Sequence, residues 1–334
     1  MKISRTTLSY IISTPLIILF LLYSTSSTNG PDYINYIRMF DRINTTDGLV
    51  EKVLVAKDVL VGIIVSIISP TSRSEFTIVF FIIGLVNCLY RFYLIKIMGL
   101  KFIPYFIIYI IFLSPGLDFA ALRALMGLSF LTIYHCSIKK NKLILVLACF
   151  SHISMLIPVI FSLDITKKIL NKINIIYLCL IIIIMTFVSS GLLKFIPSTE
   201  TYINIQGSGL LFLRVLATLL LLLFIYHLNL NSNNPEFSNR IIITATLTCA
   251  IALGLIQINI AASRYLEIVN FLLLIFVFSL NLMNLKTIVN YGIIIITLIS
   301  IILNLSYRNS VSDLWNLLLT SDFSSLNIIY GFLN

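Results

Sequence analysis

Residues 209–228 read GLLFLRVLATLLLLLFIYHL, and they show which solvent surrounds this chain. The stretch contains a single Lys or Arg, Arg214. A helix of about 20 apolar residues spans the bilayer's hydrocarbon core of roughly 30 Å. Similar runs recur along the chain between short polar intervals. We expect spanning helices at residues 8–23, 76–95, 102–115, 118–136, 142–163, 173–190, 209–228, 240–258, 263–283 and 285–305.

The composition agrees with a membrane-embedded chain. Of the 334 residues, 59% are hydrophobic and 11% are charged, and the mean hydropathy is +1.05. A soluble domain carries about 25% charged residues. Lipid offers no hydrogen-bond partners, so the backbone N–H and C=O groups of each segment must bond to one another. Continuous apolar runs therefore predict helices. We therefore expect an all-α, polytopic helical membrane protein with about 10–11 transmembrane helices. It forms one domain over residues 1–334, with a first polar loop at 24–52 and a short tail at 306–334.

Charge and rare residues exclude several classes of function. The net charge is +10, but the 23 Lys and Arg residues are scattered and form no basic stripe, so no nucleic-acid partner is expected. Loop cations that set membrane topology explain most of this excess. The five cysteines have no C-x-x-C spacing and the three histidines lack spaced carboxylates. We therefore expect neither a metal site nor a cofactor.

Residues 53–69 form an eleventh apolar run, which Lys57 and Asp58 interrupt. If this run crosses the membrane, the basic loops 91–101 and 139–142 lie outside. If it is re-entrant or interfacial, both loops lie inside, as the positive-inside rule prefers. We favour the second arrangement, although it places the cluster Lys167, Lys168 and Lys172 outside.

The first outer segment reads NGPDYINYIRMFDR over residues 29–42. Its apolar residues recur at helical spacing, which predicts a short amphipathic helix on the membrane surface with tyrosines as interfacial anchors. A functional interpretation remains open beside this one. In it, Asp32 and Asp41 are acid/base candidates, and Arg38 and Arg42 bind a phosphate.

The stretch SPGLDFAALR at residues 114–123 predicts a Pro-Gly turn between two helices, with Asp118 as the N-cap of the second. Arg123 then lies about 7.5 Å along that helix. A guanidinium at this depth needs an anion. The anion is either a carboxylate such as Asp118 or a phosphate of the substrate.

Four further residues carry ionisable groups within apolar runs: His152, Arg214, Arg264 and Glu267. His152, flanked by Ser151 and Ser154, is either satisfied by a neighbouring hydroxyl or carbonyl, or acts as a base or donor. Arg264 and Glu267 have the spacing of a helical ion pair. Arg214 has no acidic neighbour at that spacing. Cations near membrane entry points suit an anionic, lipid-linked substrate.

These motifs together resemble the bacterial O-antigen and exopolysaccharide polymerases of the Wzy or EpsG type. The resemblance rests on the Gly-x-Asp-Tyr-x-x-Tyr stretch at residues 30–36, on Asp118-Phe119 with Arg123-Ala124, on FSHIS at 150–154, and on Arg264-Tyr265. The family commonly has Gln after the central Arg, where this chain has Ala124. Any role of that glutamine is therefore absent here.

The resemblance implies an inner-membrane glycosyltransferase without a metal or cofactor. It would move a growing glycan from an undecaprenyl diphosphate carrier onto a lipid-linked repeat unit at the periplasmic face. Its expected partners are undecaprenyl-diphosphate-linked oligosaccharide and membrane lipid, with a flippase and a chain-length regulator beside them. The implied site positions are Asp32, Arg123, His152 and Arg264. From the chemistry we assign catalysis to Asp32, Arg123 and His152, and diphosphate binding to Arg38, Arg123, Arg214 and Arg264.

Three other activities are compatible with the same residues. A flippase or transporter would move the lipid-linked sugar without lengthening it. A membrane O-acyltransferase would use His152 as a base, and a polyprenyl-phosphate-sugar transferase would use Asp32 and add one sugar. A ladder of glycan lengths distinguishes a polymerase from all three.

Overall fold

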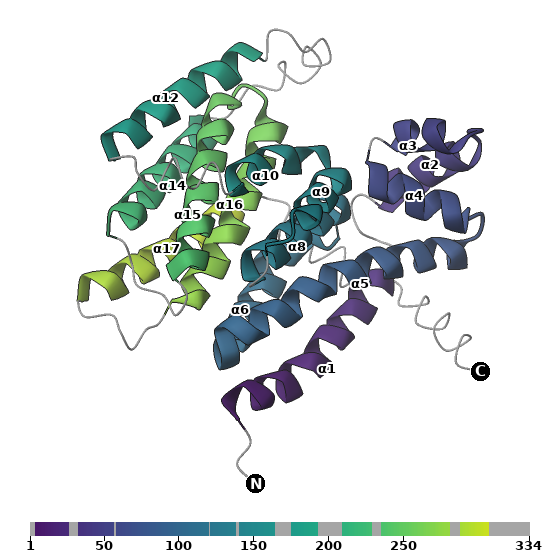
Figure 1. The fold of residues 1–334 in the computed structure, drawn as a ribbon, viewed down its shortest axis with the longest axis horizontal. Coiled ribbons are helices and arrows are strands. Elements are labelled where there is room, and N and C mark those ends of the chain that lie inside the picture. Colours follow the sequence, from purple (N-terminus) through teal and green to yellow (C-terminus); the bar gives the residue numbers. More distant parts are fainter. Residues whose placement is uncertain are drawn as a thin grey trace. The chain divides into compact units, whose positions relative to one another are not determined.

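The computed structural model describes residues 4–26, 33–56, 58–119, 121–137, 140–163, 175–192, 209–228, 235–280 and 288–306. Within these residues the regular elements are helices, and no β-strand occurs (Figure 1). They form two compact units, unit 1 over residues 4–156 and unit 2 over residues 157–306. The predicted all-α class is confirmed.

The helices have the length and surface of membrane-spanning elements. Large apolar side chains stay exposed on their outer faces, for example Leu19 at 63% and Leu213 at 59%, and such faces suit lipid. Five stretches of the described chain are long and apolar enough to cross a bilayer: Thr6–Thr25, Glu75–Leu117, Gly209–Leu228, Glu236–Gly254 and Ala261–Ser279. Shorter apolar helices cover Val59–Ile68, Lys142–Ser151, Ile153–Ser162 and Tyr291–Asn304. The chain is a polytopic helical membrane protein.

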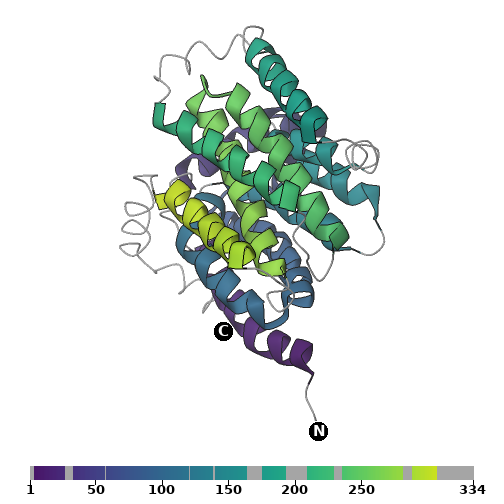
Figure 2. The same cartoon turned by 90° about the vertical axis from the view of Figure 1, so that its left-hand side faces the viewer.

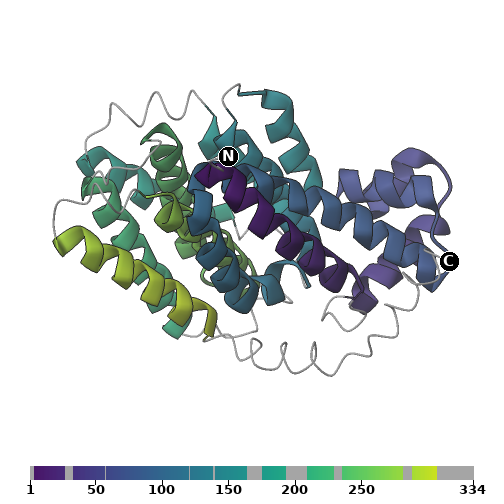
Figure 3. The same ribbon diagram turned by 90° about the horizontal axis from the view of Figure 1, so that it is seen from below.

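In unit 1, α1 (Arg5–Ser26) packs along α5 (Arg73–Met98), as Figure 3 shows. The Tyr10 hydroxyl of α1 donates to the Phe92 carbonyl of α5 at 3.1 Å. α5 begins with a capping box between Ser72 and Glu75. It ends at Gly99, whose φ of 59° lies in the region that glycine adopts without strain. The loop predicted at residues 91–101 is therefore wrong over residues 91–98, because these residues belong to α5.

The chain then reverses through η1 (Gly99–Lys101), α6 (Phe102–Ile108), the π-helical segment η2 (Tyr109–Leu113) and α7 (Ser114–Leu117). Pro115 has no backbone N–H to donate. The residue before it, Ser114, donates its N–H to the Tyr109 carbonyl five residues back, which is the hydrogen bond of a π-helix. Pro115 lies inside α7, so the predicted Pro-Gly turn is wrong. The predicted N-cap role of Asp118 is also wrong, because α8 (Leu122–Cys136) begins later and has Ala121 at that position.

Three short helices lie between α1 and α5 in the sequence: α2 (Tyr33–Asn44), α3 (Leu49–Ala56) and α4 (Val59–Ile68). α3 and α4 fold back on each other as a helical hairpin, which we call the α3–α4 hairpin. A Cβ on Gly62 would lie 3.0 Å from Val53 Cα, so the two arms pack with their backbones close. Arms of 8 and 10 residues measure about 12 and 15 Å, too short to span a bilayer. Residues 53–69 therefore form no continuous spanning helix.

α8 and α9 (Lys142–Ser151) form a further hairpin of unit 1. Gly127 permits their close approach, because a Cβ there would lie 3.1 Å from the Ala148 carbonyl oxygen. The predicted helix 142–163 is interrupted at His152. It continues as η3 (Ile153–Met155) and α10 (Leu156–Ser162), and α10 extends into unit 2.

Unit 2 contains α12 (Ile175–Leu192), α14 (Gly209–Leu228), α15 (Pro235–Gly254), α16 (Asn259–Ser279) and α17 (Ile288–Ser306), packed side by side (Figure 2). α15 and α16 are its most buried spans. α15 contacts both α12 and α14, and α16 contacts α17. The core of unit 2 therefore lies along α15 and α16, and the outer helices present apolar faces to lipid.

Candidate functional site

Arg123 is the centre of a charged site in unit 1. It is the second residue of α8, and its Nη1 lies 2.5 Å from Oδ2 of Asp58. Asp58 stands at the bend of the α3–α4 hairpin, directly before α4. The Arg123 side chain is 29% exposed, whereas that of Asp58 is 3% exposed. The cation can therefore be reached from outside, while its counter-anion is enclosed.

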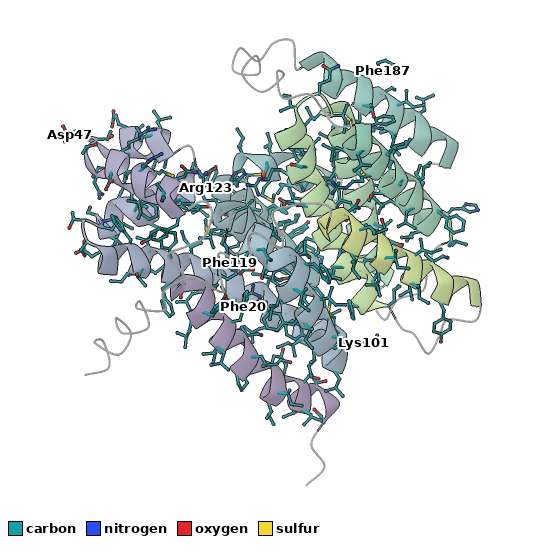
Figure 4. All side chains as sticks on the ribbon, turned by 180° about the vertical axis from the view of Figure 1, so that it is seen from behind. Phe20, Asp47, Lys101, Phe119, Arg123 and Phe187 are labelled. Carbon is teal, nitrogen blue, oxygen red and sulfur yellow. The ribbon has the colours of Figure 1, made fainter. Side chains whose placement is uncertain are left out.

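Helix α2 covers the same arginine. The guanidinium carbon lies 5.5 Å from the centre of the Tyr36 ring, and Nη1 lies 3.8 Å from the Met39 sulfur. Arg123 is labelled in Figure 4. An aromatic face and a thioether shield the cation from water on one side. The α2–α4 segment and the first turn of α8 thus form one site.

The amphipathic helix predicted for residues 29–42 exists as α2, but its aromatic side contacts protein. Phe40 and Ile43 are fully buried, and the Tyr33 and Tyr36 rings lie 5.5 and 5.7 Å from the Phe80 ring of α5. The expected anchoring at the membrane interface is therefore wrong for the buried Tyr36, whereas Tyr33 is half-buried and for it the expectation stays a prediction. The aromatic contacts hold α2 against α5 and thereby hold Tyr36 over Arg123.

The polar face of α2 carries the other predicted residues of this segment. Arg38, Asp41 and Arg42 are all exposed. Arg38 is the residue before Met39, which contacts Arg123. Asp32 lies outside the described residues.

His152 lies between α9 and η3 and caps the latter. Its Nδ1 accepts the Ser154 backbone N–H at 3.1 Å and lies 2.7 Å from the Ser154 hydroxyl oxygen. Because Nδ1 accepts that N–H, the proton of the neutral ring belongs on Nε2. Arg123 comes one turn before Gly127 in the sequence and His152 one turn after Ala148, and in an antiparallel hairpin both steps lead toward the same end. The two side chains therefore belong to the same level of unit 1.

The carboxylate of Asp118 does not pair with Arg123, contrary to one of the two alternatives above. It binds Arg91 of α5 at 2.9 Å and accepts the Tyr109 hydroxyl. Arg91 is 1% exposed and Asp118 is 3% exposed. Four aromatic rings surround the Arg91 guanidinium, with centres 5.0–5.5 Å away: Phe20, Tyr90, Phe106 and Tyr109. This enclosed pair joins α5 to the end of α7.

Unit 2 contains the other two predicted phosphate ligands. Arg264 pairs with Glu267 at 3.2 Å, which confirms the pairing expected from their spacing. Arg214 donates to the backbone oxygen and the side-chain oxygen of Asn304 on α17. Asn304 in turn donates to Thr218 and Asn270, so Arg214 belongs to a polar network of α14, α16 and α17. Among the described residues, Asn304 supplies both of these acceptors for Arg214.

The candidate site residues therefore fall into two groups, Arg38, Arg123 and His152 in unit 1 and Arg214 and Arg264 in unit 2. Sequence reasoning missed Asp58 and Arg91 as partners. Both could have been singled out as residues that need a partner or a function, because each places a charge within an apolar run. In the described part of the chain, no three His, Cys, Asp or Glu residues lie close enough to hold a metal ion.

The fold and site define a polytopic helical membrane protein with an accessible arginine in unit 1. Residues 10–319 match the EpsG family, and the chain belongs to that family. No curated protein and no solved structure matches the chain. Membership supports a general role as an exopolysaccharide or O-antigen polymerase, and hence a glycosyltransferase-like activity.

Proposed function

We propose that this protein polymerises a lipid-linked glycan in the inner membrane of a bacterium. It takes the growing glycan from one undecaprenyl diphosphate carrier and transfers it to the non-reducing-end sugar of another lipid-linked repeat unit at the periplasmic face. Membership of the EpsG family supports the polymerase activity. The observation that carries the site is the accessible guanidinium of Arg123 above its enclosed partner Asp58.

The reaction explains why an arginine is needed. A hydroxyl oxygen of the acceptor sugar forms a bond to the anomeric carbon of the donor glycan. The bond from that carbon to the diphosphate oxygen breaks, and the lipid diphosphate leaves with the electron pair. Fixed cations stabilise the negative charge that develops on this oxygen. The planar guanidinium of Arg123 suits a phosphate because it can donate two parallel hydrogen bonds.

Arg38, Arg214 and Arg264 are the proposed supporting ligands of diphosphate. Arg38 is exposed on α2, which covers Arg123. Arg264 is 31% exposed beside Glu267, so its charge is shared and its contribution should be smaller than that of Arg123. We expect no metal and no cofactor, since the leaving group is already activated as a diphosphate.

The acceptor hydroxyl must lose a proton, and Asp32 or His152 is the candidate base. The basic Nδ1 of His152 is engaged with Ser154, so the neutral ring carries its proton on Nε2. An Nε2–H group can donate a hydrogen bond to a phosphate or sugar oxygen, but it cannot take up the proton of the acceptor hydroxyl. We therefore assign a donor role to His152 and the base role to Asp32.

The test is a gel of surface polysaccharide from the host strain after deletion of the gene. The strain is complemented with wild type, with Arg123→Ala, or with Lys142→Ala, which removes an exposed cation at the start of α9 as a matched control. We expect the ladder of glycan lengths to return with wild type and Lys142→Ala but not with Arg123→Ala at equal protein level. A ladder that survives deletion with altered mass or antigenicity would overturn the proposal in favour of acyl or side-branch transfer.

A further inference from the structure

Two groups of hydrogen-bond donors lie near Asp58: the guanidinium of Arg123 and the backbone N–H groups of the first turn of α4. It occupies the N-cap of α4 with an extended backbone (φ −129°, ψ 113°), yet its side chain makes no capping bond. Aspartate is a preferred N-cap because its carboxylate accepts from the N–H groups of the first turn. Here the carboxylate is bound to Arg123 instead. The residue can therefore bind the arginine or cap its own helix.

We propose, resting on the function proposed above, that Asp58 is the resting counter-anion of Arg123 and that the diphosphate of the lipid carrier displaces it. The displaced carboxylate then turns to cap α4. Asp58 is in this sense a positioning residue, because it acts on the substrate through Arg123. It balances the guanidinium while the site is empty, and it makes every incoming anion compete for the same cation.

The exposures of the two partners support an exchange of this kind. Arg123 is 29% exposed, so an anion can approach it without first opening the protein. Asp58 is 3% exposed and cannot simply move into water. A buried carboxylate without donors is costly, and the unused first turn of α4 provides donors close to it. A diphosphate carries more charge than a carboxylate and can bind the guanidinium through two oxygens.

The packing of the α3–α4 hairpin favours rotation of one side chain over movement of the hairpin. Gly62 of α4 lies so close to Val53 of α3 that a Cβ would be 3.0 Å from the Val53 Cα. Val61 and Val65 on α4 are fully buried. Asp58 therefore changes partners on a fixed backbone.

Three substitutions separate charge from capping at this position. Asp58→Asn removes the competing charge and keeps a good N-cap, so it should bind a diphosphate more tightly than wild type. Asp58→Glu keeps the charge but is a poorer cap, so it should bind no more tightly than wild type. Arg123→Gln removes the cation and should lose binding. A purely structural Asp58 predicts the opposite sign for Asp58→Asn, because a disturbed site binds less.

The experiment titrates the purified full-length protein in detergent with farnesyl diphosphate. Farnesol tests the contribution of the chain alone, and inorganic pyrophosphate tests the phosphates alone. We expect the Kd of Asp58→Asn to fall about two- to fivefold relative to wild type, as the loss of one competing ion pair allows. We also expect the double variant Asp58→Asn with Arg123→Gln to bind as weakly as Arg123→Gln. The rise in melting temperature on adding the diphosphate should be larger for Asp58→Asn than for wild type.

The outcomes distinguish this inference from the function on which it rests. If Arg123→Gln loses binding while Asp58→Asn binds equally or more weakly than wild type, the exchange is wrong and the diphosphate site stands. If Arg123→Gln binds like wild type, or wild type binds neither diphosphate, then the anion site at Arg123 is wrong and the exchange falls with it. Tighter binding by Asp58→Asn that the double variant abolishes supports both.

Discussion

Replacing Asp118 by Asn should destabilise unit 1 strongly, because it leaves the Arg91 charge uncompensated between α5 and α7. Arg91 is 1% exposed and Asp118 is 3% exposed, with 2.9 Å between Nη2 and Oδ1. Breaking a buried pair by removing one partner costs about 3–5 kcal/mol. Replacing both partners by well-packed hydrophobic residues of similar volume is often neutral, and an Asn at position 118 can still accept the Tyr109 hydroxyl. The double variant Arg91→Met with Asp118→Asn should therefore recover most of the loss.

Buried thiols provide the assay. Cys88 and Cys249 are free and buried, so a thiol-reactive fluorophore labels them when the protein unfolds in detergent. On the scale of soluble domains of this size, a loss of 3–5 kcal/mol lowers the melting temperature by roughly 6–20 °C. Lys142→Gln is the control, since it removes an exposed cation and should change stability by less than about 0.5 kcal/mol.

The comparison between the single and the double variant tests the reasoning. If Asp118→Asn melts within about 2 °C of wild type, then the enclosed charge does not depend on this carboxylate. If the double variant is less stable than the single one, then the aromatic rings around Arg91 contribute more than its pairing with Asp118. Either result would refute the account of this pair as a charge held by its partner.

Two further substitutions test the neighbourhood of Arg123. Gly127→Ala places a Cβ against Met155 and 3.1 Å from the Ala148 carbonyl oxygen, so it should cost about 1–3 kcal/mol; an unchanged melting temperature would contradict the close packing of α8 on α9. His152→Asn keeps an acceptor for the Ser154 N–H but lacks Nε2–H, so the fold should persist while the yield of long glycan falls about tenfold. A loss of about 10²–10⁴ at equal protein level would instead assign the general base to His152.

Local properties of the sequence predict most of the helices. Hydropathy over about 20 residues places α1, α14 and α16, because a membrane span depends on its own residues rather than on distant ones. Spacing within one helix predicts the pair of Arg264 and Glu267 for the same reason. The break of residues 53–69 is also visible in the sequence, since a charged residue there interrupts an apolar run.

The partners of the arginines in unit 1 depend on how the chain folds back. Arg123 and Asp58 are 65 residues apart, and Arg91 and Asp118 are 27 apart. The first pair requires the bend between α3 and α4, and the second requires the reversal at Gly99. No local spacing predicts either pairing. From the sequence, Asp118 could therefore be expected to pair with Arg123. In the structure it follows the π-helical segment and α7, and it pairs with Arg91.

The pairs Arg91–Asp118 and Arg123–Asp58 of unit 1 show that charge at membrane depth does not by itself mark a site. Both arginines have a buried aspartate as partner, but Arg91 is enclosed by aromatic rings and Arg123 is 29% exposed. A substrate can reach Arg123 while the surrounding side chains stay in place. It could reach Arg91 only after the aromatic rings around that residue had moved. Loss of polymer in an Arg91 variant therefore reports on folding, and it bears on catalysis only if the folded protein is present in equal amount. For Arg123, loss of polymer with an unchanged melting temperature bears directly on the reaction.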